Sequence, residues 1–324
     1  MEELFPPEFI SGSVKKQRDL DELLAKYHDY SPWFIQVAAA WPEIRRWYEY
    51  WWPKVAPYLD KNFVSKLRMK KENSARAWEF ELAVVMLEHG FELQERTGDF
   101  GPDLCIASAD GKKIWIEGTT CDSGEVDPVP PRPVLIPGQI HLGGGDLETE
   151  NRPRVLRITG AIGSKFEKYK KYLSNPKSGV SDKDSFIIAI NGSDIEWASY
   201  SNILLKRAVF GQGPDVYVRS QSGGLAGPFY TSAPTITKKT ANGEEVIPTN
   251  FMEADEFSGI SAVLYCGHHA YACEGNGHKP GDCFLFAYHA KAKQPIPDQF
   301  FKFGIGIRKD LEALSISEKS QFDH

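Results

Sequence analysis

The chain has 324 residues, of which 41% are hydrophobic and 25% are charged, and its formal net charge is −6. This length and composition suit a globular protein with one large domain or two ordinary ones, and they exclude a low-complexity or collagen-like chain. No apolar run reaches the roughly 20 residues of a membrane-spanning helix, and the N-terminal residues lack the basic start and apolar stretch of a signal peptide.

The first part of the chain, residues 1–73, is predicted to be helical and is rich in tryptophan. Pro42 is placed to start a helix, and Trp47, Trp51 and Trp52 follow it within the predicted helical segment. We interpret these aromatic rings as a layer that packs on the core. A base-stacking platform or a surface for a protein partner is the alternative interpretation.

The clearest predicted helix spans residues 74–90. Its apolar side chains fall on one broad face, and Gly90 is placed to end it. Three strand-like runs follow, at residues 91–96, 103–108 and 113–119. Asp110-Gly111, between the last two runs, is a strong signal for a hairpin turn. The predicted local order is therefore a helix followed by three strands.

A loop rich in proline and glycine follows at residues 121–152, and we expect it to lie on the surface. Residues 158–173 are predicted to form a basic amphipathic helix, and residues 186–190 a fully apolar, buried strand. Because nucleic acid binds where lysine and arginine cluster, the negative net charge does not exclude binding along this helix. A helix at residues 199–210 and a strand at residues 215–219 come next.

The last third of the chain is polar and rich in turns at first, and then carries two runs that are predicted as core strands, at residues 260–265 and 284–288. We therefore predict an α/β protein with three regions. These are an N-terminal helical region at residues 1–73, a core at residues 74–219, and a C-terminal, β-rich α+β extension at residues 220–324 that packs on the core.

Two acidic residues belong to the predicted hairpin. Asp103 begins one strand and Glu117 lies near the end of the next, and facing side chains on adjacent antiparallel strands lie about 5 Å apart. A carboxylate in the apolar run around Glu117 is costly to bury without a partner. A divalent cation such as Mg²⁺ is the simplest partner, because it takes carboxylate oxygens. The alternative is that Asp103 caps a turn and Glu117 pairs with a basic neighbour.

These residues resemble the motif of the PD-(D/E)XK nuclease superfamily, which has the restriction-endonuclease-like fold. Pro102-Asp103 matches the Pro-Asp of the motif and Glu117 matches its second acid, within a segment that spans about residues 74–191. The resemblance implies a core with the order helix, three strands, helix and strand. It also implies a mixed sheet that is flanked by helices.

The resemblance further implies an acid on the preceding helix, for which Glu79 is the first candidate and Glu81 the second. Together with Asp103 and Glu117, this acid would hold Mg²⁺ or Mn²⁺. The implied function is a metal-dependent endonuclease of restriction or defence type that hydrolyses phosphodiester bonds, in DNA rather than RNA. Nucleases of the restriction type often dimerise, so the resemblance also predicts a homodimer.

The sequence departs from the motif at Thr119, where the family has a lysine that orients the attacking water and stabilises negative charge. Lys165, on the predicted basic helix, is the candidate that supplies the missing charge, and Arg157 is the candidate that holds a phosphate. If no lysine takes over this role, the same fold would be a non-catalytic module that binds nucleic acid or a protein.

A second group of candidate metal ligands lies near the C-terminus. Cys273, His278 and Cys283 have the spacing of the latter part of a zinc knuckle, and His269 or Cys266 is the candidate fourth ligand. A glycine-rich loop that happens to carry these residues is the alternative. The odd total of five cysteines favours a reducing, cytoplasmic location over a disulfide framework. The sequence contains no Gly-x-Ser-x-Gly, so it does not predict an esterase-type hydrolase.

Overall fold

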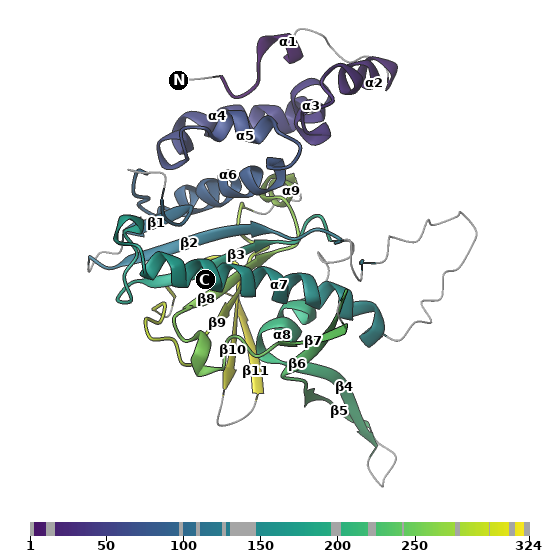
Figure 1. The fold of residues 1–324 in the computed structure, drawn as a ribbon, viewed down its shortest axis with the longest axis vertical. Coiled ribbons are helices and arrows are strands. Elements are labelled where there is room, and N and C mark those ends of the chain that lie inside the picture. The colour runs from purple at the N-terminus through teal and green to yellow at the C-terminus, as the bar shows by residue number, and fades with distance from the viewer. Residues whose placement is uncertain are drawn as a thin grey trace, which may run out of the picture.

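The structure of the protein is a computed structural model. It describes residues 3–10, 17–96, 100–107, 111–124, 128–129, 147–195, 202–219, 225–241, 243–275, 279–297, 299–310 and 315–320. Within these ranges, helices cover both faces of a central mixed sheet (Figure 1). The described helices include none that is both long and apolar enough to cross a membrane.

Helices from the N-terminal part of the chain form a layer at one end of the molecule (Figure 1). They are α1 (Pro7–Ile10), α2 (Gln17–Lys26), α3 (Pro32–Ala39), α4 (Pro42–Val55), the short 3-10 helix η1 (Ala56–Tyr58) and α5 (Phe63–Arg68). Ser31 begins α3, because its side chain accepts a hydrogen bond from the Phe34 N–H. The rings of Trp52 and Phe63 stack on Phe80 of the next helix. The tryptophan-rich region therefore packs on the core, as we interpreted it from the sequence.

The next helix, α6 (Asn73–Glu88), lies between this helical layer and the sheet (Figure 1). Every side chain from Ala77 to Met86 is buried, as expected for a helix that is covered on opposite sides. Gly90 follows the helix with a positive φ of 78°, a conformation that costs glycine little and ends the helix at the predicted place.

The predicted hairpin is present as β1 (Leu104–Ala107) and β2 (Lys113–Thr120), with Leu104 opposite Ile116. The strand that was predicted at residues 91–96 is reduced to a single bridge between Leu93 and Ile106. Leu93 is the only buried residue of that stretch, so little apolar burial holds a longer ladder. β3 (Ser185–Asn191) pairs in parallel with β2, and α7 (Leu147–Leu173) is the crossover helix. α7 begins earlier than predicted, because Pro153 lies inside it without ending it.

The described strands of the central sheet have the order β1-β2-β3-β8-β9-β10-β11. The last four are β8 (Ala262–Cys266), β9 (Leu285–Tyr288), β10 (Ile305–Asp310) and β11 (Ser315–Ser320). β8 runs parallel to β3, and β9 runs antiparallel to β8. The C-terminal region thus extends the same sheet that the core begins. β8 joins this region to β3 through backbone hydrogen bonds, and local sequence patterns do not reveal such a pairing.

The remaining strands form two hairpins outside the central sheet. They are β4 (Gln212–Arg219) with β5 (Leu225–Ser232), and β6 (Thr235–Thr240) with β7 (Gly243–Pro248). The other helical segments are α8 (Asn202–Phe210), α9 (Ala270–Gly275), η2 (Pro176–Ser178) and η4 (Asp255–Phe257). In Figure 1 these two hairpins project from the side of the sheet that carries α7 and α8.

Two apolar clusters hold the layers together, one on each face of the sheet. Ile114 and Ile116 of β2 belong to the cluster that includes α6 and the N-terminal helices. Phe186 and Ile188 of β3 belong to the cluster under α7 and α8. This alternation is expected for strands buried on both faces, and it confirms the predicted α/β class with a mixed sheet flanked by helices.

Candidate active site

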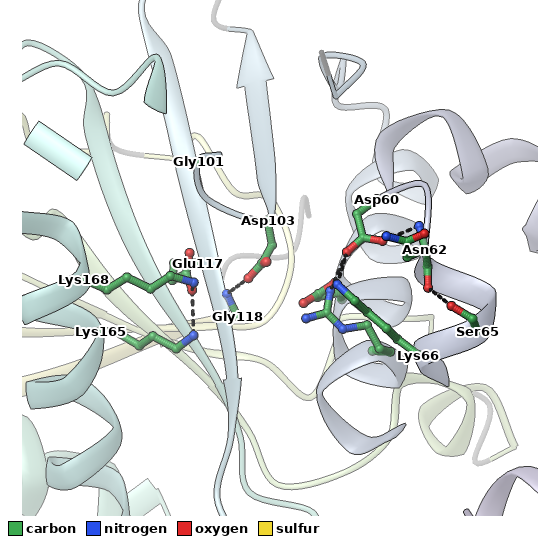
Figure 2. Close-up of polar contacts among 12 residues, drawn as sticks. Asp60, Asn62, Ser65, Lys66, Gly101, Asp103, Glu117, Gly118, Lys165 and Lys168 are labelled. Atoms are coloured by element: carbon green, nitrogen blue, oxygen red, sulfur yellow. Dashed lines mark hydrogen bonds and ion pairs between the residues drawn. The ribbon is translucent and has the colours of Figure 1, made fainter. Parts of the chain in front are cut away.

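The two acids of the predicted hairpin, Asp103 and Glu117, both lie next to Gly118 of β2. Asp103 immediately precedes β1, and its Oδ2 accepts a hydrogen bond of 2.7 Å from the Gly118 N–H (Figure 2). A Cβ atom on Gly118 would lie 3.4 Å from this oxygen and 3.3 Å from Cδ1 of Trp78. Glycine at this position therefore lets the Asp103 carboxylate approach the backbone of β2 without crowding. Glu117, the neighbour of Gly118, is completely buried.

Glu79 of α6 completes this arrangement on the helix side. Glu79 is 4% exposed, and its Oε2 accepts a hydrogen bond of 2.6 Å from the Arg76 guanidinium. Burial raises the pKa of Glu79 well above its usual range, and repulsion by Asp103 raises it further. Burial and then repulsion by Glu117 raise the pKa of Asp103. Burial and like-charge repulsion thus favour the protonated form of both carboxyl groups.

Glu117 points to the other side of the sheet, where α7 supplies its partners. The ammonium groups of Lys165 and Lys168 lie 2.6 and 2.7 Å from its Oε1, and the Tyr172 hydroxyl donates to its Oε2 at 2.8 Å. Figure 2 shows both lysines reaching toward Glu117 from α7 while Asp103 turns toward Gly118. The three acids therefore lie around the Glu117-Gly118 segment of β2, with cations on the α7 side.

Lys165, the candidate for the missing charge, contacts Glu117 directly, and a second lysine accompanies it. Lys168 was not predicted as a site residue. Its spacing from Lys165 and Tyr172 puts all three on one face of α7. The spacing alone could have predicted that Lys168 accompanies Lys165, because residues three and four apart on a helix are neighbours in space.

Thr119 and Arg157 face a different space from the three acids. Both line a separate cavity of about 290 Å³ beside the end of β2. A neighbouring cavity of about 880 Å³ shares Arg157 and Lys238 with it. The Arg157 guanidinium packs so closely on Gly124 that a Cβ there would lie 2.0 Å from its Cζ. A positively charged side chain is thus held next to open space, some distance along β2 from Glu117.

Glu79 and Asp103 carry hard oxygen ligands that suit Mg²⁺ or Mn²⁺, and one oxygen of Glu79 is already paired with Arg76. A proton on either group would compete with a cation for these oxygens. Across the described ranges, no group of three or more His, Cys, Asp or Glu side chains is arranged to hold a metal. Glu117 is occupied by two ammonium groups, so it would join such a site only by releasing one of them.

The second-choice acid, Glu81, is directed elsewhere. It is completely buried and accepts hydrogen bonds of 2.9 Å from the Tyr48 hydroxyl and the Ala270 N–H. Its Oε1 also lies 2.9 Å from Nδ1 of His269. Residues two apart on a helix point in nearly opposite directions, about 200° around the axis. Glu79 and Glu81 therefore serve different clusters, and Glu79 is the one beside Asp103.

The predicted zinc ligands are only partly described. His269 directs Nδ1 toward Glu81. Cys283 is disulfide-bonded, and its sulfur lies 3.5 Å from the thiol of Cys266. His278 and the side chain of Cys273 lie outside the described residues. The part of this set that the structure describes gives the zinc site no support, and zinc binding stays a prediction for metal analysis to test.

Comparison with known proteins adds no guide to this site. No family model, curated protein or solved structure matches the chain. The function of the site has to be inferred from its own geometry and chemistry.

Proposed function

We propose that the protein is a metal-dependent nuclease that hydrolyses phosphodiester bonds, in DNA rather than RNA, of restriction or defence type. The observation that carries this proposal is the gathering of Glu79, Asp103 and Glu117 around Gly118, with Lys165 on the far side of Glu117. The order α6, β1, β2, α7 and β3 supports a restriction-endonuclease-like core. The resemblance of Pro102-Asp103 and Glu117 to the PD-(D/E)XK motif supports the same core.

Each side chain of the site has a separate task in this proposal. Asp103 and Glu79 would hold Mg²⁺ or Mn²⁺, with Glu117 as a further ligand once it releases a lysine. When bound, the cation supplies an acidified water and polarises the scissile phosphate. Lys165 orients the attacking water and stabilises the negative charge that develops on the phosphate. It thereby supplies the charge that Thr119 lacks.

The substrate would approach along the α7 side of β2. Arg157 and Lys238 share the cavities beside the end of this strand, and guanidinium and ammonium groups bind phosphate. We propose that they hold the nucleic-acid backbone near the acids. A homodimer, in which each copy cuts one strand, is part of the same proposal and rests on the resemblance alone.

One observation favours a second candidate function. Two ammonium groups already neutralise Glu117, and the Gly118 N–H already satisfies one oxygen of Asp103. Such an arrangement is stable without a cation. It supports a non-catalytic module on the same fold that binds nucleic acid or a protein. Metal-dependent cleavage distinguishes the two functions, because only the nuclease needs the cation.

Cleavage of supercoiled plasmid DNA tests the proposal. We expect the protein to cut it with Mg²⁺ or Mn²⁺ and not with a chelator. Asp103→Ala and Glu117→Ala should each lower the cleavage rate by about 100-fold or more, since each removes a ligand or its lysine partner. Glu43→Gln is the control, because that carboxylate is exposed on α4. Equal cutting by the parent and both alanine variants would exclude the nuclease.

The raised pKa values of Glu79 and Asp103 predict how metal stabilisation depends on pH. Both pKa values are raised on folding, so the folded protein keeps a proton that the unfolded chain releases. The stabilisation by this proton is complete below about pH 4, and it is lost as the pH rises through the folded pKa values. Mg²⁺ competes with the proton, so excess Mg²⁺ should raise the melting temperature more at about pH 8 than at about pH 5.

Thermal unfolding with and without Mg²⁺ measures this difference. Asp103→Asn should abolish the Mg²⁺ effect at both pH values, because the variant lacks the charged ligand. Asp182→Asn, at an exposed position, is the matched control and should keep the effect. An Mg²⁺ shift that is the same in the parent and in Asp103→Asn would show that the cation binds elsewhere.

A further inference from the structure

A second polar cluster lies on the opposite side of α6 from the three acids. Its centre is Glu81, a completely buried carboxylate that accepts hydrogen bonds from Tyr48 and from the backbone of Ala270. The remaining partner is Nδ1 of His269, at 2.9 Å from Oε1. An ionised carboxylate only accepts hydrogen bonds, so the nitrogen that faces Glu81 must be the donor. In the neutral imidazole of His269 the proton is therefore on Nδ1. The other ring nitrogen, Nε2, is then a base.

The imidazole ring is held in one orientation. It stacks between Trp33 and Tyr271, with ring centroids 6.0 and 5.1 Å away and interplanar angles of 26° and 10°. In this orientation Nε2 lies 3.5 Å from Oγ of Ser193. That distance is at the long end of a hydrogen bond, and it is usual for a serine and its base before a substrate binds. Ser193, His269 and Glu81 are thus joined by two successive side-chain contacts.

The backbone brings Ser193 to this place at the end of β3. Gly192 donates its N–H to the Cys266 carbonyl at 2.7 Å, and Asn191 Oδ1 accepts from the Ser193 N–H at 2.8 Å. A Cβ on Gly192 would lie 2.4 Å from the Tyr265 hydroxyl oxygen, so only glycine fits there. His269 follows the end of β8, which runs parallel to β3. Ligands of α/β proteins bind beyond the carboxyl ends of such strands.

The cluster is partly open to solvent. Ser193 is half-buried, and the His269 side chain is 25% exposed. Asp194, the next residue, lines the cavity of about 880 Å³ that also contains Arg157 and Lys238. This cavity thus begins one residue from Ser193, which is not itself among the lining residues.

We propose that Ser193 is an activated nucleophile that takes the acyl group of a carboxylic ester, with His269 as its general base and Glu81 as the residue that positions the imidazole. This activity is separate from the proposed nuclease and does not rest on it. Oγ of Ser193 bonds to the carbonyl carbon of the ester, and its proton passes to Nε2 of His269. The bond to the alcohol oxygen breaks, and the alcohol leaves with the proton from Nε2.

The second half of the reaction restores the serine. A water molecule attacks the acyl carbon, gives its proton to Nε2, and releases the carboxylic acid as Ser193 regains its hydrogen. Triads of this kind are identified by geometry and not by position in the chain. The absence of Gly-x-Ser-x-Gly from the sequence therefore does not exclude it.

Labelling of the full-length protein with a fluorophosphonate tests the proposal. An activated serine oxygen bonds to the phosphorus of this probe and displaces fluoride. We expect the adduct on Ser193 in the peptide map of the folded parent protein, and no adduct at that peptide in Ser193→Ala. Ser174→Ala is the matched control, because that hydroxyl is exposed and donates to the Lys170 carbonyl. Ser193 of the Ser174→Ala variant should label at the parent rate.

The role of the base is tested in the same assay. His269→Ala should lower the labelling rate by about 100-fold or more, and added imidazole should restore part of it, which a merely structural role would not allow. A parent protein that labels Ser193 no faster than Ser174 would overturn the proposal, whether or not the His269 variant folds. Labelling of folded His269→Ala at the parent rate would overturn it as well.

Discussion

Replacing both Lys165 and Lys168 by methionine is expected to lower the free energy of unfolding by about 3–5 kcal/mol. Glu117 is completely buried, and these two ammonium groups are the cations that contact it. Without them, the Tyr172 hydroxyl is the one hydrogen-bond partner that this buried carboxylate keeps among the residues that the structure describes. Methionine keeps the apolar part of each side chain, so the loss reports on charge and not on packing. Urea unfolding measures it.

The single variants should differ from each other. Lys165 is 17% exposed and Lys168 is 45% exposed, so water screens the second ion pair more strongly. Lys168→Met alone should cost at most about 1 kcal/mol, and Lys165→Met should cost more. Adding Glu117→Gln to the double variant should recover most of the stability, because the buried charge is then gone. A double variant within about 1 kcal/mol of the parent would show that Glu117 is neutral in the folded protein.

Variants of the same lysines distinguish the proposed nuclease from the non-catalytic alternative. In the proposed nuclease, Lys165 must act near the phosphate, so Lys165→Met should lose cleavage under conditions in which it is still folded. In the non-catalytic alternative, the lysines only neutralise Glu117, and their loss would affect stability alone. The free energy of unfolding and the cleavage rate therefore separate a catalytic lysine from a structural one.

Local sequence patterns predicted those parts of the fold that depend on residues near each other in the chain. The helix at residues 74–90 and the strands at 113–119 and 186–190 lie within a few residues of α6, β2 and β3. Their apolar periodicity is strong because both faces of these elements are covered. The strand predicted at residues 91–96 failed for the opposite reason, since only Leu93 is buried there.

The candidate site was predictable where one motif carried it. Asp103 and Glu117 belong to one hairpin, so their spacing placed them near Gly118, and Lys165 followed from the basic helix. The contact of Gly118 with Asp103 could not be predicted, because it depends on how closely α6 packs. The cluster of Ser193, His269 and Glu81 could not be predicted from the sequence either. Its hydrogen-bonded pairs are 76 and 188 residues apart in the chain, and only the pairing of β3 with β8 brings them together.

The second large effect is expected at Glu81, the carboxylate of that cluster. Glu81→Ala should lower the free energy of unfolding by about 3–5 kcal/mol, because it leaves three donors without their acceptor. These donors are the Tyr48 hydroxyl, the Ala270 N–H and Nδ1 of His269. Tyr48 and Ala270 are completely buried, so water cannot replace the lost acceptor at low cost.

Two further variants make this measurement specific. Glu88→Ala removes an exposed carboxylate from the end of the same helix, and it should change the free energy of unfolding by no more than about 0.5 kcal/mol. Glu81→Gln keeps one acceptor oxygen but turns an amide N–H₂ toward the remaining donors, so its loss should be intermediate. If Glu81→Ala were as stable as Glu88→Ala, the carboxylate would not hold His269 in place. The alignment of His269 with Ser193 would then need another cause, such as the stacking on Trp33 and Tyr271.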